Sequence, residues 1–301
     1  MEIRALQTLR AVRAHGRVTS AAMVLHLTPS AVSQPLSALQ DEMGVTLTER
    51  VGRGLRLTPA GDALADTAVD VAMAVERARA ACTDFLEQPR GTVSISAFQS
   101  GAQMLLPGLL TRVQTLPGVT IAYFDEDVPL NDFPALTDRF NIVIAHRPGG
   151  GSGWARESSA LTAVPLLRQP LDLAVTLGHR LARRAQVHAG EFDDEDWITV
   201  REGFPVASLL DAVTAMAGGS PRVVHRINDF HVVAALEAAG HGVALLPRHT
   251  TTGHPHLRLI PQAGTPVARR GDALLRPDQA ERRVVRLVLD ELAAVAGALA
   301  S

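Results

Sequence analysis

At 301 residues the chain is long for a single hydrophobic core, so two or three domains are expected. Its 47% hydrophobic and 20% charged residues are ordinary for a globular protein, and no apolar run approaches the roughly 18 residues of a membrane span, which excludes a membrane partner. The net charge of −2 hides an asymmetry, because residues 1–60 carry seven arginines against four carboxylates. The basic end is the candidate nucleic-acid-binding end.

Two further features concern the compartment. The first twenty residues include five charged side chains and no apolar core, so no signal peptide is expected and the protein should remain in the cytoplasm. The lone cysteine, Cys82, excludes an intrachain disulfide and fits a reducing environment.

Residues 19–61 have the spacing, caps and turn residues of a winged helix-turn-helix. Thr28 and Pro29 begin its second helix with a hydroxyl cap and a first-turn proline, and Gly44 ends it. An apolar stripe at helical spacing is expected to face the core: Val32, Leu36, Leu39 and Met43. The outer face carries short polar side chains that could reach base edges: Ser30, Ser33, Gln34, Ser37 and Gln40.

The stretch Arg50–Leu57 is predicted to be a glycine-turned hairpin, the wing. Its three arginines are the composition expected along phosphates. The predicted DNA contacts are therefore Thr28, Pro29, Ser30, Ser33, Gln34, Ser37, Arg50, Arg53 and Arg56. Double-stranded promoter or operator DNA is the expected partner.

At these residues the chain resembles the LysR-type bacterial transcriptional regulators. The resemblance rests on Ala21-Ala22, on Leu27 through Gln34, on Leu39 with Glu42 and Gly44, and on Arg50 through Gly61. Two positions depart from the family pattern. Leu47-Thr48-Glu49-Arg50 lacks the usual aromatic core residue, and Pro35 deletes the helical bond to the Ala31 carbonyl at a cost of about 3 kcal/mol. A kinked recognition helix, or a displaced first turn, is expected.

Thr58-Pro59 restarts a helix that is predicted to run to about Gln88. Its apolar positions keep a heptad: Leu64, Ala68, Val71, Val75, Ala78, Cys82 and Phe85. Such a seam favours a partner helix, although an alanine-rich seam also suits packing on its own domain. The resemblance implies antiparallel pairing with a second subunit, so a homodimer or homotetramer is expected.

Beyond residue 90 the periodicity alternates between strand and helix, which predicts a parallel α/β sheet. Strands are expected at 92–97, 119–124, 141–146, 171–176, 197–200, 223–227, 243–246 and 267–275, and helices at 102–116, 135–139, 207–216, 232–239 and 279–298.

Two sequence segments, Leu173–Ala182 and Ala238–Pro247, also resemble the effector-binding region of the LysR-type family. The resemblance implies a fold of class α + α/β: a winged helix-turn-helix at 1–61, a linker and dimerisation helix at 62–89, and a periplasmic-binding-protein-like regulatory domain at 90–301. Its first subdomain would comprise 91–163 and 265–301, and its second 164–264. A ligand would lie in the cleft between them.

The walls of such a cleft are strand ends and helix starts. The predicted effector contacts are Gln99, Ser100, Arg147, Arg201, Phe204 and Asp229. Arginines beside a carboxylate suit a small organic acid or an amino acid, while the alternative is that these residues are solvated loop ends.

No cofactor, metal or catalytic residue is predicted. His249, His254 and His256 lie in a loop without a nearby cysteine or paired carboxylate, and the acidic run 193–196 is expected to be a solvated turn rather than a calcium site. Nucleophile-elbow, Walker and dinucleotide motifs are missing. A ligand-responsive regulator is favoured over a regulator whose C-terminal part serves assembly only, and over an enzyme with an accessory DNA domain.

Overall fold

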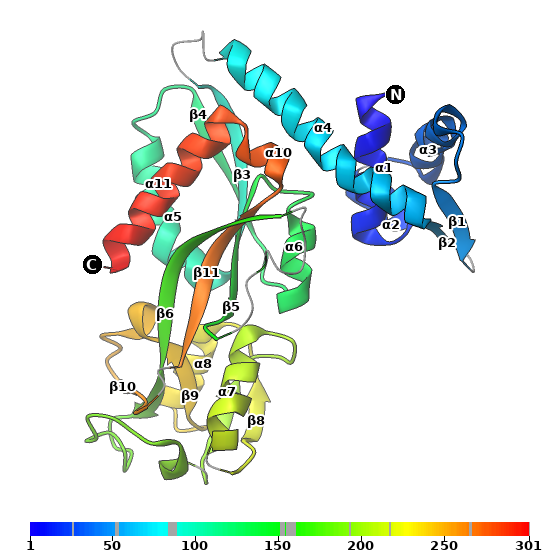
Figure 1. Cartoon of the computed structure of the whole chain (residues 1–301). Helices are drawn as coiled ribbons and strands as arrows, with labels where there is room; N and C mark the ends of the chain where they lie inside the picture. Colours follow the sequence, from blue (N-terminus) through cyan, green and yellow to red (C-terminus); the bar gives the residue numbers. More distant parts are fainter. Residues whose placement is uncertain are drawn as a thin grey trace.

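The computed structural model describes residues 1–25, 27–51, 54–83, 89–150, 154, 161–192, 194–216, 218–264 and 267–300. Figure 1 shows a small helical body with a hairpin, a larger α/β body, and one long helix between them. Over the described ranges, no helix is long and apolar enough to cross a membrane.

The N-terminal body is a winged helix-turn-helix, as predicted. It consists of α1 (Ile3–His15), α2 (Val18–Val24), α3 (Pro29–Met43) and the antiparallel hairpin of β1 (Thr48–Val51) and β2 (Gly54–Leu57). Leu9, Leu36 and Leu47 are almost fully buried in one shared core. A Cβ on Gly61 would lie 2.1 Å from the Leu47 carbonyl oxygen, so only glycine lets the next helix approach the hairpin this closely.

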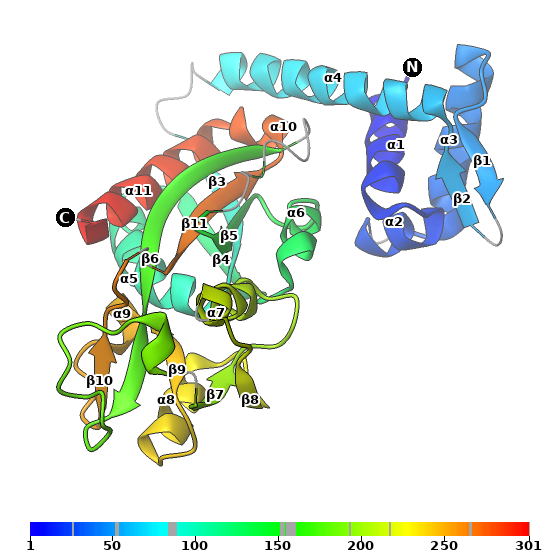
Figure 2. The ribbon, with the colours of Figure 1, turned by 60° about the horizontal axis from the view of Figure 1, so that its bottom comes forward.

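The linker helix is α4 (Pro59–Thr83), and its predicted continuation to Gln88 falls on residues 84–88, outside the described part. Thr58 caps its start, because the Thr58 hydroxyl oxygen accepts a hydrogen bond from the Gly61 N–H at 3.1 Å. Figure 2 shows one half of α4 beside α1 and the other half extending over the α/β body. The helix therefore connects the two bodies directly.

The α/β body is built on a seven-stranded sheet of order β10-β6-β11-β5-β3-β4, with β9 also pairing with β6. Its strands are β3 (Gly91–Ala97), β4 (Val119–Asp125), β5 (Ile142–Pro148), β6 (Thr162–Thr176), β9 (Ala244–Pro247), β10 (Leu257–Ile260) and β11 (Ala268–Leu275). A separate parallel pair is formed by β7 (Asp196–Thr199) and β8 (Arg222–Arg226).

The helices of this body are α5 (Gln99–Val113), α6 (Phe133–Leu136), α7 (Pro205–Met216), α8 (Phe230–Ala238), α9 (Arg248–Thr251), α10 (Pro277–Ala280) and α11 (Arg283–Ala300). Three differences from the sequence prediction matter: α5 begins earlier than expected, α9 and β10 were not predicted, and the last predicted helix is two helices, α10 and α11.

The prediction of a parallel sheet is correct for only part of the seven-stranded sheet. β3 pairs in parallel with β4 and β5, but β11 lies antiparallel between β5 and β6, and β9 and β10 also pair antiparallel with β6. The reason is that the chain passes from one half of the body to the other along β6 and returns along β11. Residues 162–170 of β6 pair with β11, and residues 171–176 pair with β9 and β10. Only this second half of β6 was predicted.

Two hydrophobic cores lie on either side of this crossing. One contains Ile95 of β3 and Leu105 of α5, and the other contains Leu173 of β6 and Trp197 of β7. The ends of β3, β5, β7 and β8 therefore meet where the two cores face each other, which is where a cleft was expected.

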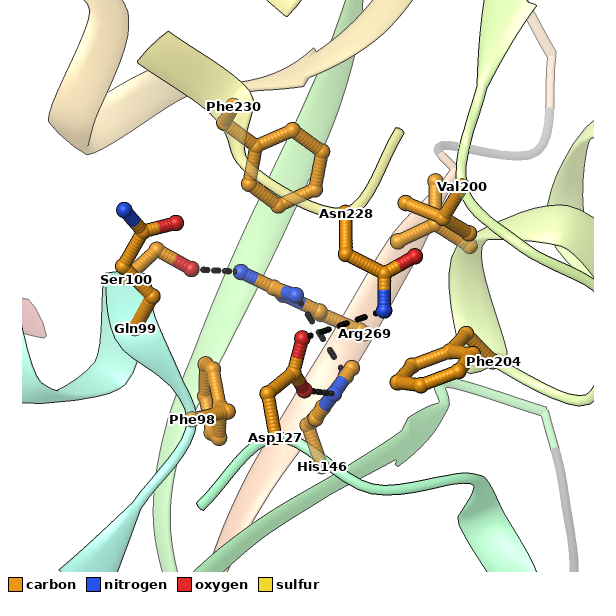
Figure 3. Close-up of a pocket in the computed structure, with 11 residues that line it drawn as sticks. Phe98, Gln99, Ser100, Asp127, His146, Val200, Phe204, Asn228, Phe230 and Arg269 are labelled. Carbon is orange, nitrogen blue, oxygen red and sulfur yellow. Dashed lines mark hydrogen bonds and ion pairs between the residues drawn. The ribbon is translucent and has the colours of Figure 1, made fainter. Parts of the chain in front are cut away.

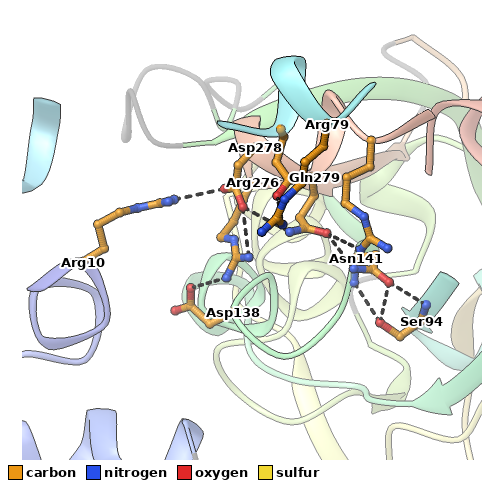
Figure 4. Close-up of polar contacts among 10 residues, drawn as sticks. Arg10, Arg79, Ser94, Asp138, Asn141, Arg276, Asp278 and Gln279 are labelled. Atoms are coloured by element: carbon orange, nitrogen blue, oxygen red, sulfur yellow. Dashed lines mark hydrogen bonds and ion pairs between the residues drawn. The ribbon is translucent and has the colours of Figure 1, made fainter. Parts of the chain in front are cut away.

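The N-terminal body also contacts the α/β body through side chains (Figure 4). Arg10 of α1 donates from Nη2 to Oδ1 of Asp278 at 3.2 Å, and Arg276 approaches the other Asp278 oxygen at 3.2 Å. His15 Nε2 lies 2.9 Å from Oδ2 of Asp138. Although burial raises the pKa of Asp278, the guanidiniums of Arg276 and Arg10 hold it below its usual value. Asp278 is therefore a charged bridge between the two bodies.

Candidate functional site

The polar face of α3 is open to solvent. Thr28 caps the helix, accepting from the Ala31 N–H at 3.2 Å, and Ser33 Oγ donates to the Pro29 carbonyl at 2.9 Å. The predicted contact residues on this helix lie on its solvent side: Thr28, Pro29, Ser30, Ser33, Gln34 and Ser37. Their side chains are exposed on the side away from the core formed by Val32, Leu36 and Leu39, which makes them accessible to an external partner.

Two predictions about α3 are corrected. Met43, placed in the buried stripe, is exposed because it is the last residue of the helix and no neighbouring element in the described part covers it. Gln40, placed on the outer face, instead accepts hydrogen bonds at Oε1 from the N–H groups of Leu47 and Thr48. Gln40 thus holds the wing against α3 and is not free to contact a partner.

Pro35 lies inside α3, which nevertheless runs as one helix from Pro29 to Met43. The Thr28 cap and Pro29 keep their places at its start, so the first turn is not displaced. The missing N–H of Pro35 is accommodated without ending the helix.

The wing is the β1–β2 hairpin, in which Arg50 lies opposite Leu55 and Glu49 opposite Arg56. Arg50 and Arg56 are exposed. The third predicted arginine, Arg53, lies outside the described residues. The exposed arginines of the wing and the polar face of α3 belong to one small body, which is the arrangement that a groove-binding helix with a phosphate-contacting ribbon requires.

The heptad seam of α4 divides into two parts. Ala68 is buried in the core of the N-terminal body, with Leu64 and Val71 packed against it. The alternative reading, packing on its own domain, therefore holds for this part of the helix. The second part comprises Val75, Ala78 and Cys82, of which Cys82 is exposed, whereas Phe85 lies outside the described residues. Pairing through this second part remains a prediction.

A small cavity lies between the two halves of the α/β body (Figure 3). Its volume is about 10 Å³, enough for roughly one water molecule. It is lined by side chains that follow several strands, namely Phe98, Gln99, Ser100, Asp127, His146, Val200, Phe204, Val206, Asn228, Phe230 and Arg269. These come from both halves of the body, so the cavity is where a cleft would open.

Arg269 of β11 fills the centre of this cavity and is only 2% exposed. Its Nε donates to Oε1 of Gln169 at 2.7 Å, and Nη2 donates to the Ser100 hydroxyl. Its guanidinium carbon lies 4.7 Å from the Phe98 ring centroid and 5.3 Å from that of Phe230. Among the described residues, no carboxylate lies within 4.0 Å of it. The site therefore holds a buried cation without an anionic partner in contact.

The ionisable side chains that line the cavity differ in charge. Burial, reinforced by the Arg269 guanidinium, lowers the pKa of His146 to about 4, so its imidazole is neutral at pH 7. Burial also lowers the pKa of Arg269 to about 9, while the Asp127 carboxylate acts in the opposite direction. Asp127 accepts from the Asn228 amide at 3.4 Å, a contact across the cavity between the two halves.

Of the six predicted effector contacts, Gln99, Ser100 and Phe204 line the cavity. The other three do not. Arg147 forms an ion pair at 2.8 Å with the buried Asp272, and exposed Arg201 lies over the Phe204 ring at 5.1 Å. Asp229 caps α8 by accepting from the His231 N–H at 2.8 Å, and it also accepts from the Gln99 side chain.

The sequence reasoning missed Phe98, Asp127, His146, Asn228, Phe230 and Arg269. In the described ranges, no three His, Cys, Asp or Glu side chains are grouped so that they could hold a metal ion.

Comparison with known proteins identifies both parts of the chain. Residues 3–62 match the model of the bacterial regulatory helix-turn-helix protein of the LysR family, and residues 86–297 match that of the LysR substrate binding domain. The chain belongs to the LysR family of bacterial transcriptional regulators. Its second part is thus an effector-binding domain by family, and the resemblance stated from the sequence is confirmed.

Relatives at modest identity agree with this family assignment. The transcriptional dual regulator GltC of Bacillus subtilis is 28% identical over 256 residues, which cover 83% of this chain and 82% of GltC. The DNA-binding transcriptional dual regulator OxyR of Escherichia coli K12 is 26% identical over 250 residues, covering 82% and 79%. The relatives named here are transcriptional regulators.

Solved structures share the fold of the whole LysR-family chain. A full-length OxyR variant of Pseudomonas aeruginosa superposes with a TM-score of 0.67 at 17% identity, covering 97% of this chain and 94% of that one. Full-length CbnR in complex with its target DNA gives a TM-score of 0.53 at 20% identity, covering 98% and 100%. At these identities the likeness establishes the fold alone.

Proposed function

We propose that this LysR-family chain is a sequence-specific DNA-binding regulator that acts in the cytoplasm as a homodimer or homotetramer, is not an enzyme, and responds to a small molecule, an organic acid or an amino acid, whose carboxylate binds beside Arg269. The DNA-binding half rests on the exposed polar face of α3 beside the exposed arginines of the wing. Side chains such as Ser33 and Gln34 would contact base edges, while Arg50, Arg53 and Arg56 would contact phosphates.

The single observation that carries the effector half is the buried guanidinium of Arg269. Removing a cation from water is costly unless an anion compensates it, and among the described residues no carboxylate contacts this one. A carboxylate entering between Ser100 and Phe230 would supply that anion. The site is a fitting regulatory position, because its walls belong to both halves of the domain and an effector would favour one relative placement of them.

DNA binding is tested by footprinting the purified full chain on the promoter region next to its own gene, with scrambled duplex of equal length as the control. Preference for the promoter at moderate ionic strength is the expected result. Equal binding to both duplexes would remove the proposed sequence specificity.

The effector is tested by thermal shift with a panel of small carboxylates and the uncharged amides of the same skeletons. At least one carboxylate should raise the Tm and alter the footprint. Arg269→Gln should abolish the shift, whereas Arg270→Gln should leave it, because Arg270 is the exposed neighbour on the same strand and does not line the cavity. A shift that survives Arg269→Gln would contradict the assignment.

A second candidate is a regulator whose C-terminal part serves assembly only. It is favoured by the small size of the cavity, about 10 Å³, and by the hydrogen bond that Arg269 Nη2 donates to the Ser100 hydroxyl oxygen, which uses one of the arginine donors that a ligand would need. Under this reading no compound of the panel raises the Tm, and truncation of the α/β body changes the oligomeric state alone.

A further inference from the structure

The cavity around Arg269 holds a second charge of opposite sign. Asp127 follows β4, and its carboxylate points into the cavity with Oδ2 3.4 Å from the Asn228 amide nitrogen and Oδ1 3.8 Å from His146 Nε2. Both contacts are long, and the side chain is 28% exposed. In the described part of the chain, no arginine lies within 4.0 Å of this carboxylate. Asp127 is therefore an anion available to a ligand.

Resting on the proposed function, we infer that the effector is a zwitterion, an α-amino acid with an apolar side chain. Its carboxylate would pair with Arg269 and accept from the Ser100 hydroxyl, and its ammonium group would donate to Asp127 and to the Asn228 side-chain oxygen. An α-amino acid carries its two charges on adjacent positions, and Figure 3 shows the side chains of Arg269 and Asp127 pointing into the same cavity.

The net charge of the cavity supports a zwitterion over a dianion. Arg269 and Asp127 carry opposite charges, and His146 is neutral because burial lowers its pKa to about 4. A ligand with two carboxylates would place its second anion against Asp127 in a site largely screened from water, where like charges repel strongly. A simple amine would leave Arg269 without its anion. Only a ligand with both charges satisfies both groups.

The remaining walls favour an apolar side chain. Three aromatic rings, those of Phe98, Phe204 and Phe230, line the cavity together with Val200 and Val206. Two further polar groups line the cavity: the Gln99 side chain donates to Asp229, and the neutral His146 has Nδ1 3.3 Å from Nη1 of Arg269. Because the wall of Phe98–Ser100 and the wall of Asn228–Phe230 belong to different halves of the domain, room for the side chain arises by separating them.

The test uses isothermal titration of the full chain with L-alanine, L-valine, L-leucine and L-phenylalanine, each paired with the 2-hydroxy acid of the same side chain. At least one amino acid should bind, with its hydroxy acid about tenfold weaker or more, because a hydrogen bond to a charged group is replaced by one to a hydroxyl. Asp127→Asn should remove that preference by weakening the amino acid and not the hydroxy acid. Asp125→Asn is the matched control, since Asp125 is exposed on β4 and outside the cavity.

The outcomes separate this inference from the function on which it rests. Equal binding of an amino acid and its hydroxy acid, or a preference that persists in Asp127→Asn, overturns the zwitterion, and so does binding by other carboxylates alone. In those cases Arg269-dependent carboxylate binding still stands. If no carboxylate of any kind binds in a manner that Arg269→Gln abolishes, the proposed effector function falls and this inference falls with it.

Discussion

Replacing Gln40 tests the architecture of the DNA-binding body directly. Its Oε1 accepts from the N–H of Leu47 at 2.9 Å, from the N–H of Thr48 at 2.8 Å and from the Thr48 hydroxyl at 2.9 Å. One side chain thereby ties the last turns of α3 to the first strand of the wing. Gln40→Ala removes all three bonds without enlarging the side chain.

The expected loss follows from burial. Leu47 is 1% exposed, so water does not reach its backbone to replace the lost acceptor. The Thr48 N–H is partly accessible, and the Thr48 hydroxyl can turn toward solvent. An unsatisfied buried donor costs about 1–3 kcal/mol, and one buried donor with one half-buried donor gives about 2–4 kcal/mol for Gln40→Ala.

The assay must report on the N-terminal body alone. Both tryptophans, Trp154 and Trp197, lie in the α/β body, so fluorescence does not follow this unfolding. Hydrogen exchange of peptides from α3 and the wing measures their opening free energy. The matched control is Gln34→Ala, the same substitution on the exposed face of the same helix.

The two glutamine variants should separate stability from recognition. Gln34→Ala should change the opening free energy by less than about 0.5 kcal/mol but weaken operator binding by about 1–3 kcal/mol and relax its sequence preference. Exchange in Gln40→Ala as slow as in the unchanged protein would refute the role given to its three hydrogen bonds. Unaltered operator binding by Gln34→Ala would refute the proposal that Gln34, on the exposed face of α3, contacts the bases.

Three further outcomes are expected. Arg56→Ala should reduce the slope of log affinity against log salt by about one unit, and exposed Arg258→Ala, on β10, should not; equal slopes in both would deny Arg56 a phosphate contact. A double-mutant cycle of Arg10→Ala and Asp278→Asn, measured by hydrogen exchange in α1, should give a coupling free energy of about 1–2 kcal/mol, because both side chains are largely buried. Additive losses of stability would mean that this ion pair does not hold the two bodies together. Burial raises the pKa of Glu237 from 4.5 to about 9, so between these pH values the folded state keeps a proton that the unfolded chain releases. The free energy of unfolding should therefore fall as the pH rises through this interval. If the urea midpoint of Glu237→Leu falls with pH as steeply as that of the unchanged protein, this assignment is wrong.

Local patterns predicted the N-terminal body well because its elements are short and adjacent in the chain. The spacing of Val32, Leu36 and Leu39 is enough to orient α3, and the Thr28 cap fixes where it starts. Gln40 was misplaced because its exposure depends on the hairpin that follows, which periodicity within one helix does not reveal. The antiparallel place of β11 was missed for the same reason, since it depends on β6 crossing between the two halves.

The cavity shows the limit more sharply, because His146 was missed by one position on a strand, with Arg147 predicted in its place. Successive side chains on a strand point to opposite faces, so His146 lines the cavity while Arg147 turns away to pair with Asp272. Arg269 and Arg270 divide in the same way, one buried and one exposed. The feature that could have identified Arg269 is its charge. The strand from Ala268 to Leu275 is buried apart from Arg270, and burying a guanidinium there costs free energy. That cost is offset where an anion binds, so a buried arginine on such a strand indicates an anion-binding position.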